Sequence, residues 1–548
     1  MKSHPSFSLR SARYVASFVF ASVLPLVMPL VAQAKSSEKA EGKEDPAKDF
    51  FASGAVVKVS LTLDEAARKS LKETPREYAL CTVQIDGEEA LTKVGIKLKG
   101  AAGSFRELHE GPGFTVNLTK FGTKHSFHGL TRFHLNNGAQ DDSRLCEWVG
   151  NAIYTAAGLP APRVAHARVS LDGKDLGLYV FREAYDKKFL QRVYGSTAGN
   201  LYDGGFCQDI DSELEKDAGA GPDDRRDLKA LADVCREFTP EKASELEKLL
   251  DVNAFIDFMA LEAMLGHWDG YTLNRNNYRV WCAMAPGLTQ FLPHGMDQLL
   301  GDPGASILAY PPAMVASTVM KNPAWRKRYR ERLIALLPHF DPAKLKPGVE
   351  TLGKKLVQEL AGKPEAAENL KGAVSGLIQR IEERYKNLQE QVNAPEPQPL
   401  QFDGEKPVNL TEWNPAPESD SIELDEKEIK GAKMYRIICK QPSKEPLGGG
   451  WRTTVLLGQG KYRITAKAKC EDVKAPPKGD DGQQHGGVRI TVGEARSKRL
   501  FDTQKLQTLE CEFEVTEVQR EVEISLDMRA LAGKAWYEAG SPQLYKLP

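Results

Sequence analysis

The sequence lacks the residue spacings that define several common kinds of binding site. Its eight cysteines are far apart and none forms a Cys-x-x-Cys pair, which excludes the usual zinc knuckle. No Gly-x-Gly-x-x-Gly motif follows an expected strand, so a standard phosphate-binding loop is absent. The formal net charge is only −1 over 548 residues, which gives no electrostatic reason to expect nucleic acid or an anionic membrane as a partner.

Long hydrophobic runs are also lacking, except for one at the N-terminus. Basic residues precede an apolar stretch over residues 14–31, and small residues follow it. The basic residues are Lys2, Arg10 and Arg13, and the small-x-small end is Ala32-Gln33-Ala34. This order predicts a secretory signal peptide over residues 1–34, with an uncleaved anchor as the alternative. We expect a disordered polar leader over 35–54 and no membrane span after cleavage.

Export would bring the cysteines into an oxidising compartment, where some of them can pair. Cys470 and Cys511 both fall in β-like segments and are the candidate disulfide. Buried free thiols are the alternative for all eight.

The chain is too long for one hydrophobic core, so two or more domains are expected. Residues 55–392 mix strands with helices, and a Pro-rich linker follows over 393–401. Residues 402–548 contain short alternating strands separated by turns, which is typical of a β-sandwich. The expected fold class is therefore α+β for the first domain and all-β for the second.

Hydrophobic periodicity places the main elements. In the first domain we expect strands at 56–63, 78–86, 93–99, 114–118, 128–135, 164–171 and 176–181. Helices are expected at 63–73, from Asp141 or Asp142 to Gly158, and at 251–267, 323–337 and 372–392. In the second domain we expect strands at 435–439, 451–457, 460–470, 487–492, 507–515 and 521–528, with a last one beginning at Trp536.

The stretch from His267 to Gly301 carries the strongest functional signal. Asp269 and three asparagines precede an expected β-hairpin, and Asp297 follows it. The three asparagines are Asn274, Asn276 and Asn277. Carboxylate and amide oxygens gathered by a hairpin suit a hard cation such as Mg²⁺, and they supply the parts of a phosphoryl-transfer site. Turn formation is the alternative role for these loop residues.

Six motifs, in this order, resemble the CotH kinase family of spore-coat protein H. They are Lys97-Leu98-Lys99-Gly100 with Ser104; Asp141–Ser143 with Gly158-Leu159-Pro160-Ala161-Pro162; Asp172-Gly173 with Gly177–Glu183; Gly199-Asn200-Leu201-Tyr202; Trp268-Asp269 with Asn276-Asn277-Tyr278; and Pro293-His294-Gly295-Met296-Asp297. Each motif is weak alone, but their common order is specific.

The resemblance implies an atypical protein-kinase-like domain with a strand-rich lobe, a more helical lobe, and ATP with Mg²⁺ or Mn²⁺ between them. It implies Asp269 as catalytic base, Asp297 as the main metal carboxylate and Asn277 or Asn274 as a further metal ligand. Glu183 would orient a lysine or reach the metal. The implied acceptor is a Ser or Thr of an exported or surface protein, and the implied location is secreted, periplasmic or on the surface of a bacterium. The five-residue step from Asp269 to Asn274 also matches the ordinary kinase catalytic loop.

The cation that would contact phosphate has more than one candidate. Lys97 and Lys99 share one face of an expected strand, and Lys99 is the first choice because it adjoins a glycine. Many relatives carry a Lys-Pro pair where this sequence has Gly111-Pro112. If that lysine matters, Arg106 or Lys120 would have to replace it. An exposed strand face is the alternative for the two lysines.

The hairpin's second half has one carboxylate, Asp297, where spore-coat relatives tend to have two. A single Mg²⁺ could still bind, because this ion needs few protein ligands. A zinc site formed by His267, His294 and Cys282 matches no usual ligand spacing.

Two other functions compete with the kinase. A non-catalytic surface scaffold could bind polysaccharide or protein through its sandwich, with Trp413, Trp451 and Trp536 stacking on sugar rings or filling the core instead. A metal-dependent hydrolase lacks an accompanying nucleophile or histidine cluster. The kinase hypothesis requires the carboxyl groups of Asp269 and Asp297 to converge on one cavity.

Overall fold

A computed structural model describes residues 45–284, 287–308, 311–395, 398–429, 431–477 and 485–548. The expected signal peptide and residues 35–44 of the expected leader lie outside the described residues. Within them, no helix combines the length and the apolar character that a bilayer crossing requires.

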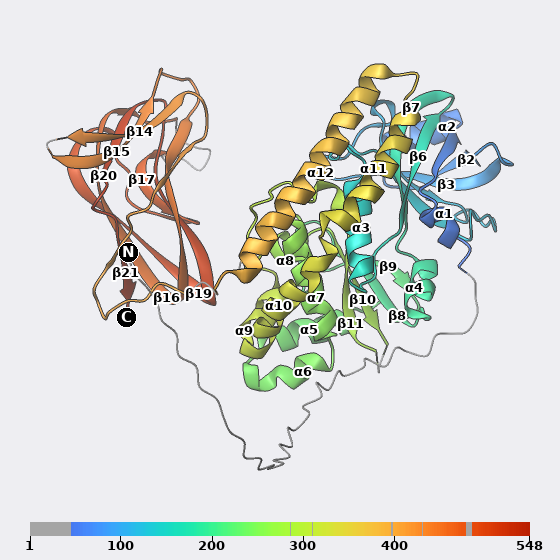
Figure 1. Ribbon diagram of the computed structural model, residues 1–548, viewed down its shortest axis with the longest axis horizontal. Coiled ribbons are helices and arrows are strands. Elements are labelled where there is room, and N and C mark those ends of the chain that lie inside the picture. The colour runs from blue at the N-terminus through green and yellow to red at the C-terminus, as the bar shows by residue number, and fades with distance from the viewer. Residues whose placement is uncertain (1–44, 285–286, 309–310, 396–397, 430, 478–484) are drawn as a thin grey trace, which may run out of the picture. The chain divides into compact units, whose positions relative to one another are not determined.

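Seven strands form a closed barrel in the N-terminal part of the chain (Figure 1). They are β1 (Val56–Thr62), β2 (Ala79–Ile85), β3 (Leu91–Lys99), β4 (Gly113–Asn117), β5 (Arg132–Asn136), β6 (Val164–Leu171) and β7 (Lys174–Glu183). Their order is β1-β2-β3-β4-β5-β7-β6, and β1 closes the barrel by pairing in parallel with β6. Alternate residues of β2 are buried, as expected for a strand with one face on a hydrophobic core.

The barrel strands agree closely with the sequence prediction except at β5, which begins at Arg132 rather than at His128. His128 and Gly129 both have positive φ angles, +45° and +76°, and form a turn instead of extended backbone. The predicted helix at 63–73 is confirmed as α2 (Glu65–Glu73), because Asp64 caps it by accepting a hydrogen bond from Ala67 N at 2.7 Å.

Residues 45–54 are packed rather than part of a solvated leader, which corrects the expectation for 35–54. They contain α1 (Lys48–Ala52), whose Phe50 and Phe51 are buried. The ring of Phe50 lies 5.3 Å from that of Phe181, centroid to centroid, so the segment contacts the barrel core. Two aromatic side chains are enough to anchor this otherwise polar segment.

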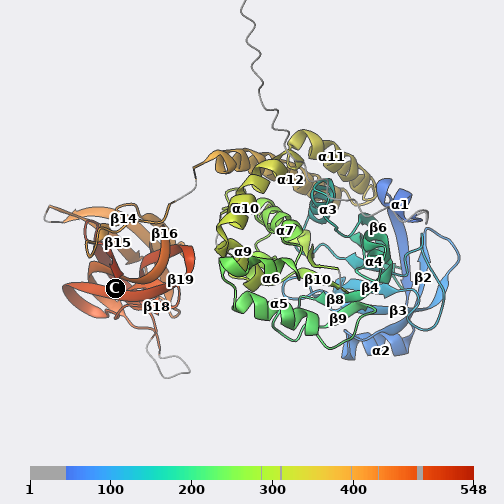
Figure 2. The ribbon, with the colours of Figure 1, turned by 90° about the horizontal axis from the view of Figure 1, so that it is seen from below.

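A four-stranded antiparallel sheet and most of the helices follow the barrel in sequence (Figure 2). The strands, in the order β11-β10-β8-β9, are β8 (Gly199–Asp203), β9 (Lys216–Gly219), β10 (Tyr278–Ala283) and β11 (Thr289–Pro293). Helix α3 (Cys146–Ala156) lies between β5 and β6 in the chain. The helices after the barrel are α4 (Lys187–Tyr194), α5 (Arg226–Arg236), α6 (Ala243–Glu247), α7 (Val252–Leu265), α8 (Tyr271–Asn274), α9 (Met314–Lys321), α10 (Pro323–Leu336), α11 (Pro342–Gln358) and α12 (Pro364–Asn393). Strands β10 and β11 form the predicted hairpin, with Tyr278 opposite Pro293.

Most predicted helices are confirmed, although α12 begins earlier than expected, at Pro364. Helix α3 begins later than expected, at Cys146, because Leu145 and neither Asp141 nor Asp142 is its N-cap residue. Helix α11 was not predicted, because Pro347 interrupts its apolar pattern and lies inside the helix. The two helices lie side by side in Figures 1 and 2.

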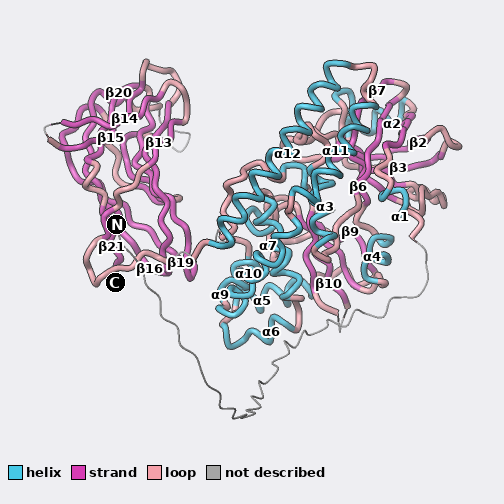
Figure 3. Tube along the Cα trace, in the orientation of Figure 1, coloured by secondary structure: helices cyan, strands magenta, loops and turns pink. Residues whose placement is uncertain are grey.

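After the linker, the described residues form strands and turns without a helix (Figure 3). The strands are β12 (Val408–Asn409), β13 (Asn414–Pro417), β14 (Ile422–Ile429), β15 (Ala432–Cys439), β16 (Leu447–Lys474), β17 (Gly487–Val492), β18 (Ala495–Arg496), β19 (Asp502–Ala530), β20 (Ala532–Glu538) and β21 (Gln543–Leu547). The predicted pairs of short strands at 451–470 and 507–528 are instead two long strands, β16 and β19. A register shift between Gly458 and Gly460 acts as a bulge, so pairing continues through the expected turn.

The three tryptophans proposed to stack on sugars are buried in this all-β part. Trp413, Trp451 and Trp536 are 8%, 4% and 7% exposed, so all three are buried. Trp413 and Trp451 belong to the hydrophobic core, as the core-filling alternative states, whereas Trp536 lies under Lys469, whose Nζ is 4.9 Å from the ring centre. The eight cysteines are all free thiols. The candidate disulfide is therefore not formed, and Cys470 instead donates from Sγ to the carbonyl of Asp502 at 3.4 Å.

Candidate active site

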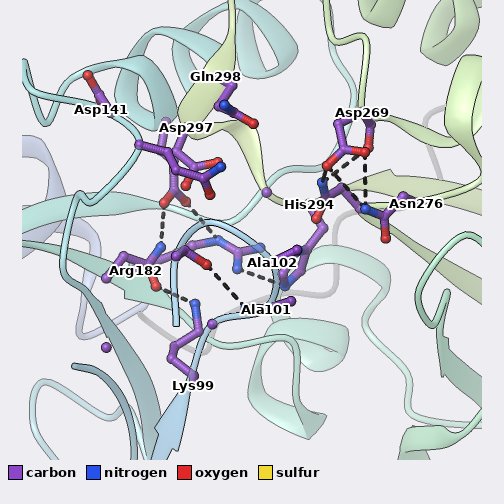
Figure 4. Close-up of a pocket in the computed structure, with 18 of the residues that line it drawn as sticks. Lys99, Ala101, Ala102, Asp141, Arg182, Asp269, Asn276, His294, Asp297 and Gln298 are labelled. Carbon is purple, nitrogen blue, oxygen red and sulfur yellow. Dashed lines mark hydrogen bonds and ion pairs between the residues drawn. The ribbon is translucent and has the colours of Figure 1, made fainter. Parts of the chain in front are cut away.

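A cavity of about 570 Å³ is lined by residues of the barrel and of the sheet and helices that follow it. Asp269 and Asp297 both line it, as the kinase hypothesis requires (Figure 4). The charged residues around it are Arg76, Lys99, Asp141, Glu147, Arg182, Asp203, Asp269, Arg279 and Asp297. Cations and carboxylates in one cavity suit a ligand that is itself a complex of an anion with a metal ion.

Asp269 is held by the three asparagines that follow it. Helix α7 ends before Gly266, whose φ of +61° turns the chain toward the cavity. Asn274, Asn276 and Asn277 donate from Nδ2 to the Asp269 carboxylate at 2.5, 3.1 and 2.7 Å. A carboxylate accepts at several lone pairs, so these donors fix the orientation of the group in the cavity.

The loop that carries Asp269 is tied to the loop that carries Asp297. His267 donates from Nε2 to the carbonyl of Gly295 at 3.2 Å, and burial lowers the pKa of His267 to about 4. In the other direction, His294 N donates to the carbonyl of Asn277 at 2.9 Å. The spacing of the two carboxylates is therefore set by direct contacts between their loops.

Buried Glu262 of α7 supports the same region. Its carboxylate accepts hydrogen bonds from Tyr271 N at 3.0 Å and from Thr272 N at 2.9 Å. These are the first residues of α8, whose exposed amide groups need acceptors. Burial raises the pKa of Glu262 to about 7.

Asp297 lies in a group of carboxylates. Burial, followed by the negative charge of Glu147, raises the pKa of Asp297 to about 6, and Asp141 acts in the same direction. Crowded carboxylates disfavour their own charges and therefore favour a bound cation. Glu147 and Asp141 thus bring negative charge near Asp297 from other segments of the chain.

The donor set fits Mg²⁺ or Mn²⁺. Asp297 offers carboxylate oxygens, and Asn274, Asn276 and Asn277 of the same cavity offer amide oxygens. Both are ligands that a hard cation prefers. In the part of the chain that the structure describes, no three His, Cys, Asp or Glu side chains cluster as a ready-made metal site. An ion here would take its remaining ligands from water and from a phosphate-bearing substrate, as Mg²⁺ commonly does.

Lys99 is the predicted lysine that reaches the cavity. Its Nζ donates to Oδ1 of Asn136, and Nδ2 of Asn136 donates in turn to Glu147. Burial, and then the positive charge of Arg182, lower the pKa of Lys99 to about 8. The side-chain amide of Asn136 thus bridges the Lys99 ammonium group and the carboxylate of Glu147, which belongs to α3.

Three predicted site residues, Lys97, Glu183 and Arg106, do not line this cavity. The Nζ of Lys97 is 5.1 Å from the centre of the Tyr78 ring, outside the cavity. Glu183 is enclosed by two ion pairs, with Arg163 at 2.8 Å and Arg192 at 2.6 Å. Glu183 does not line the cavity because neighbouring residues on a strand face opposite ways, and Arg182 enters the cavity instead. Lys97 shares a strand face with Lys99 but does not line the cavity.

Arg106 lines a different cavity and donates to the carbonyl groups of Gly103 and Phe105. Its position after a turn could not be inferred from its spacing. Gly100 to Ser104 instead form a loop of small residues at the edge of the active-site cavity. Gly100 has a φ of +106°, a backbone conformation that favours glycine. A glycine directly after a strand is therefore the feature of the sequence that indicates this loop.

Three further charged residues line the cavity without having been predicted from the sequence: Glu147, Arg182 and Arg279. Arg182 lies between Glu147, at 3.3 Å from Nε, and Nε2 of His294, which accepts from Nη1 at 3.1 Å. Arg279 pairs with Asp203 at 2.6 Å. They could not be predicted from the sequence, because a single charged residue within an otherwise apolar helix or strand can face either solvent or a cavity.

Fold and site together define a mixed α/β protein with a cavity lined by two fixed carboxylates, amides and cations. The family model of the CotH kinase protein matches residues 96–396, more than half of the chain. The chain therefore belongs to the CotH kinase protein family. The inner spore coat protein H of Bacillus subtilis (strain 168) is 23% identical over 190 residues, which cover 32% of this chain and 52% of that protein. The chain thus spans about half the length of this curated relative.

Solved structures match about a quarter of the chain. The xylanase 10B modules of Clostridium thermocellum complexed with xylohexaose are 10% identical, with a TM-score of 0.19, over 26% of this chain and 28% of that one. TmCBM61 in complex with β-1,4-galactotriose is 12% identical, with a TM-score of 0.18, over 25% of this chain and 88% of that one. The CBM22-1 xylan-binding domain of Paenibacillus barcinonensis Xyn10C is 12% identical, with a TM-score of 0.16, over 24% and 85%.

Proposed function

We propose that this chain is an exported kinase that transfers the γ-phosphoryl group of ATP to a serine or threonine of another exported or surface protein. The observation that carries the proposal is the convergence of Asp269, Asp297 and Lys99 on one cavity. The barrel would serve as the strand-rich lobe of a kinase-like fold, and the sheet with its helices as the second lobe. Membership of the CotH kinase protein family supports the same conclusion.

In the proposed reaction the acceptor hydroxyl oxygen bonds to the γ-phosphorus while its proton passes to Asp269. The bond from the γ-phosphorus to the bridging oxygen breaks, and ADP leaves with that electron pair. Lys99 holds a phosphate oxygen, and the three asparagines keep Asp269 directed at the acceptor. Asp297, with Asn274 or Asn277, would hold a divalent ion that neutralises phosphate charge.

A ligand-induced shift of the melting temperature tests this proposal. Mg²⁺ with ATP at 100 times its Kd should stabilise the native chain by about 2.7 kcal/mol, whereas Asp297→Asn should show little or no shift at the same concentration. Asp142→Asn is a matched control, because this carboxylate is exposed and does not line the cavity. Transfer of label from ATP to exported proteins would then establish the reaction.

A native chain that shows neither a shift with Mg²⁺ and ATP nor transfer of label would contradict the kinase. Non-catalytic surface assembly would then be the better explanation, and pull-down on polysaccharides by the full chain would be the next measurement.

The affinity for ATP should also depend on pH through Lys99. Because the pKa of Lys99 is lowered to about 8, its ammonium group is charged below that pH and loses its charge as the pH rises through it. We therefore expect ATP to bind more weakly at pH 9 than at pH 7. Calorimetry across this range is the measurement, and Lys99→Arg should remove the decrease, since arginine stays charged. An identical decrease in Lys99→Arg would assign the effect to another group.

A further inference from the structure

Three cationic side chains share one wall of the active-site cavity: Lys99 from β3, Arg182 from β7 and Arg279 from β10. Only 2% of the Arg182 side chain and 11% of the Arg279 side chain are exposed. Figure 4 shows Arg182 between Lys99 and Asp297. Placing several cations in a buried wall is unfavourable unless anions balance them.

The protein balances this wall only in part. Glu147 pairs with Arg182 at 3.3 Å, and Asp203 and Asp217 pair with Arg279 at 2.6 and 3.7 Å. Lys99 is instead bonded to the neutral amide of Asn136, and among the described residues it forms no ion pair. Beside burial, the charges of Arg279, Arg182 and Lys99 hold the pKa of neighbouring His294 well below its usual range, which agrees with a positive field here.

Arg182 is fixed at two of its nitrogens and unpaired at the third. Nε meets Glu147, and Nη1 donates to Nε2 of His294 at 3.1 Å. Among the described residues, its buried Nη2 has no hydrogen-bond acceptor. Buried polar groups are usually paired. The Nε atoms of eight other arginines among the described residues also lack an acceptor, but of these eight only Arg279 lines the active-site cavity. A bound anion would complete this set of partners.

We propose that Arg182 is a second phosphate-binding residue, which acts with Lys99 and Arg279 to hold the phosphate chain of the nucleotide through its Nη2. The inference rests on the proposed function, since the phosphates are those of ATP in the same cavity. Arginine suits the role because its planar fork binds phosphate oxygens directionally. His294, three residues before Asp297, is then a positioning residue that keeps Arg182 aligned with the metal-binding segment.

Binding of inorganic tripolyphosphate without metal to the full chain tests the inference, with calorimetry as the readout. Arg182→Gln should weaken binding by about tenfold or more, as expected for a lost charge-assisted hydrogen bond. Arg168→Gln is the matched control: it removes the same charge from a residue that pairs with Asp175 outside the cavity, and should leave the affinity unchanged.

Arg182→Gln leaves Glu147 buried without its partner, so the variant can fail to fold. The double variant Arg182→Gln with Glu147→Gln avoids this, because it removes both charges of the pair. It should melt close to the native chain and still bind tripolyphosphate about tenfold or more weakly.

Unchanged affinity in both Arg182 variants, with loss of binding in Lys99→Ala, would overturn the inference while leaving the kinase proposal intact. Binding of Mg²⁺ and ATP without any binding of tripolyphosphate would overturn it as well. A native chain that binds neither probe would remove both proposals.

Discussion

Replacing Asp269 by asparagine should lower the rate of phosphoryl transfer by about 10²–10⁴-fold, the usual contribution of a general base. The amide keeps the shape of the carboxylate. Asn276 bonds both oxygens of Asp269, whereas Asn274 bonds Oδ1 and Asn277 bonds Oδ2. The variant therefore keeps Asn276 and one of the other two donors, and we expect the fold to be retained. The melting shift with Mg²⁺ and ATP should also be retained, because Asp269 would act on the acceptor hydroxyl and not on the nucleotide. The measurements are the rate of phosphoryl transfer and the shift of the melting temperature with Mg²⁺ and ATP, both made on the same preparation.

The contrast with Asp297→Asn makes this result specific. The Asp297 variant should lose both nucleotide binding and transfer, whereas the Asp269 variant should lose transfer alone. Asp142→Asn, with its exposed carboxylate, should change neither. Native turnover by Asp269→Asn would show that another group takes the proton.

Replacing Arg384 by methionine should give the largest loss of stability. Arg384 of α12 is 1% exposed, and its guanidinium donates to the carbonyl groups of Ala263, Met264, Pro303 and Ala305 at 2.7, 2.9, 2.9 and 2.6 Å. Ala263 and Met264 lie in the last turn of α7, where carbonyl groups lack partners within the helix. Methionine fills the volume but donates nothing. Gly266 N and Gln391 Nε2 still donate to the carbonyl groups of Ala263 and Ala305 at 3.1 and 3.0 Å, so those of Met264 and Pro303 lose their donor among the described residues. An acceptor left unpaired costs about 1–3 kcal/mol, so we expect a loss of about 3 kcal/mol.

Chemical unfolding of the native and variant chains measures this loss. Lys386→Met is the control on the same helix, since Lys386 is exposed and the same replacement there should change stability by less than about 0.5 kcal/mol. Equal midpoints for Arg384→Met and the native chain would mean that water or rearranged donors satisfy these carbonyl groups.

Local patterns in the sequence predicted much of the first domain. Asp64 and Asp251 mark the starts of α2 and α7, because each caps its helix with its own side chain. The β10–β11 hairpin was predicted from its alternation and its turn, and it delivers Asp297 to the cavity that Asp269 also lines. These features depend on residues close in sequence, which is why they could be predicted without coordinates.

The parts that could not be predicted depend on pairing between distant segments. Arg182 reaches the cavity because β7 pairs with β5 in a register that sets it opposite His134. A shift of one residue in that register would have brought Glu183 inward, and no local pattern distinguishes the two cases. Glu147 likewise meets Arg182 only after α3 has packed beside the barrel strands. Whether a charged residue faces the site is thus harder to predict from the sequence than where the turns near the site lie.

Two hydrogen bonds join the loop that carries Asp269 to the loop that carries Asp297, one from His267 to Gly295 and one from His294 to Asn277. The two loops are therefore expected to move together. Arg182 of β7 bonds His294 of the same loops, so the barrel strand that carries this arginine is held to them as well. In the proposed kinase, the base, the metal carboxylate and the phosphate-binding arginine would therefore keep fixed positions relative to one another before the substrate enters.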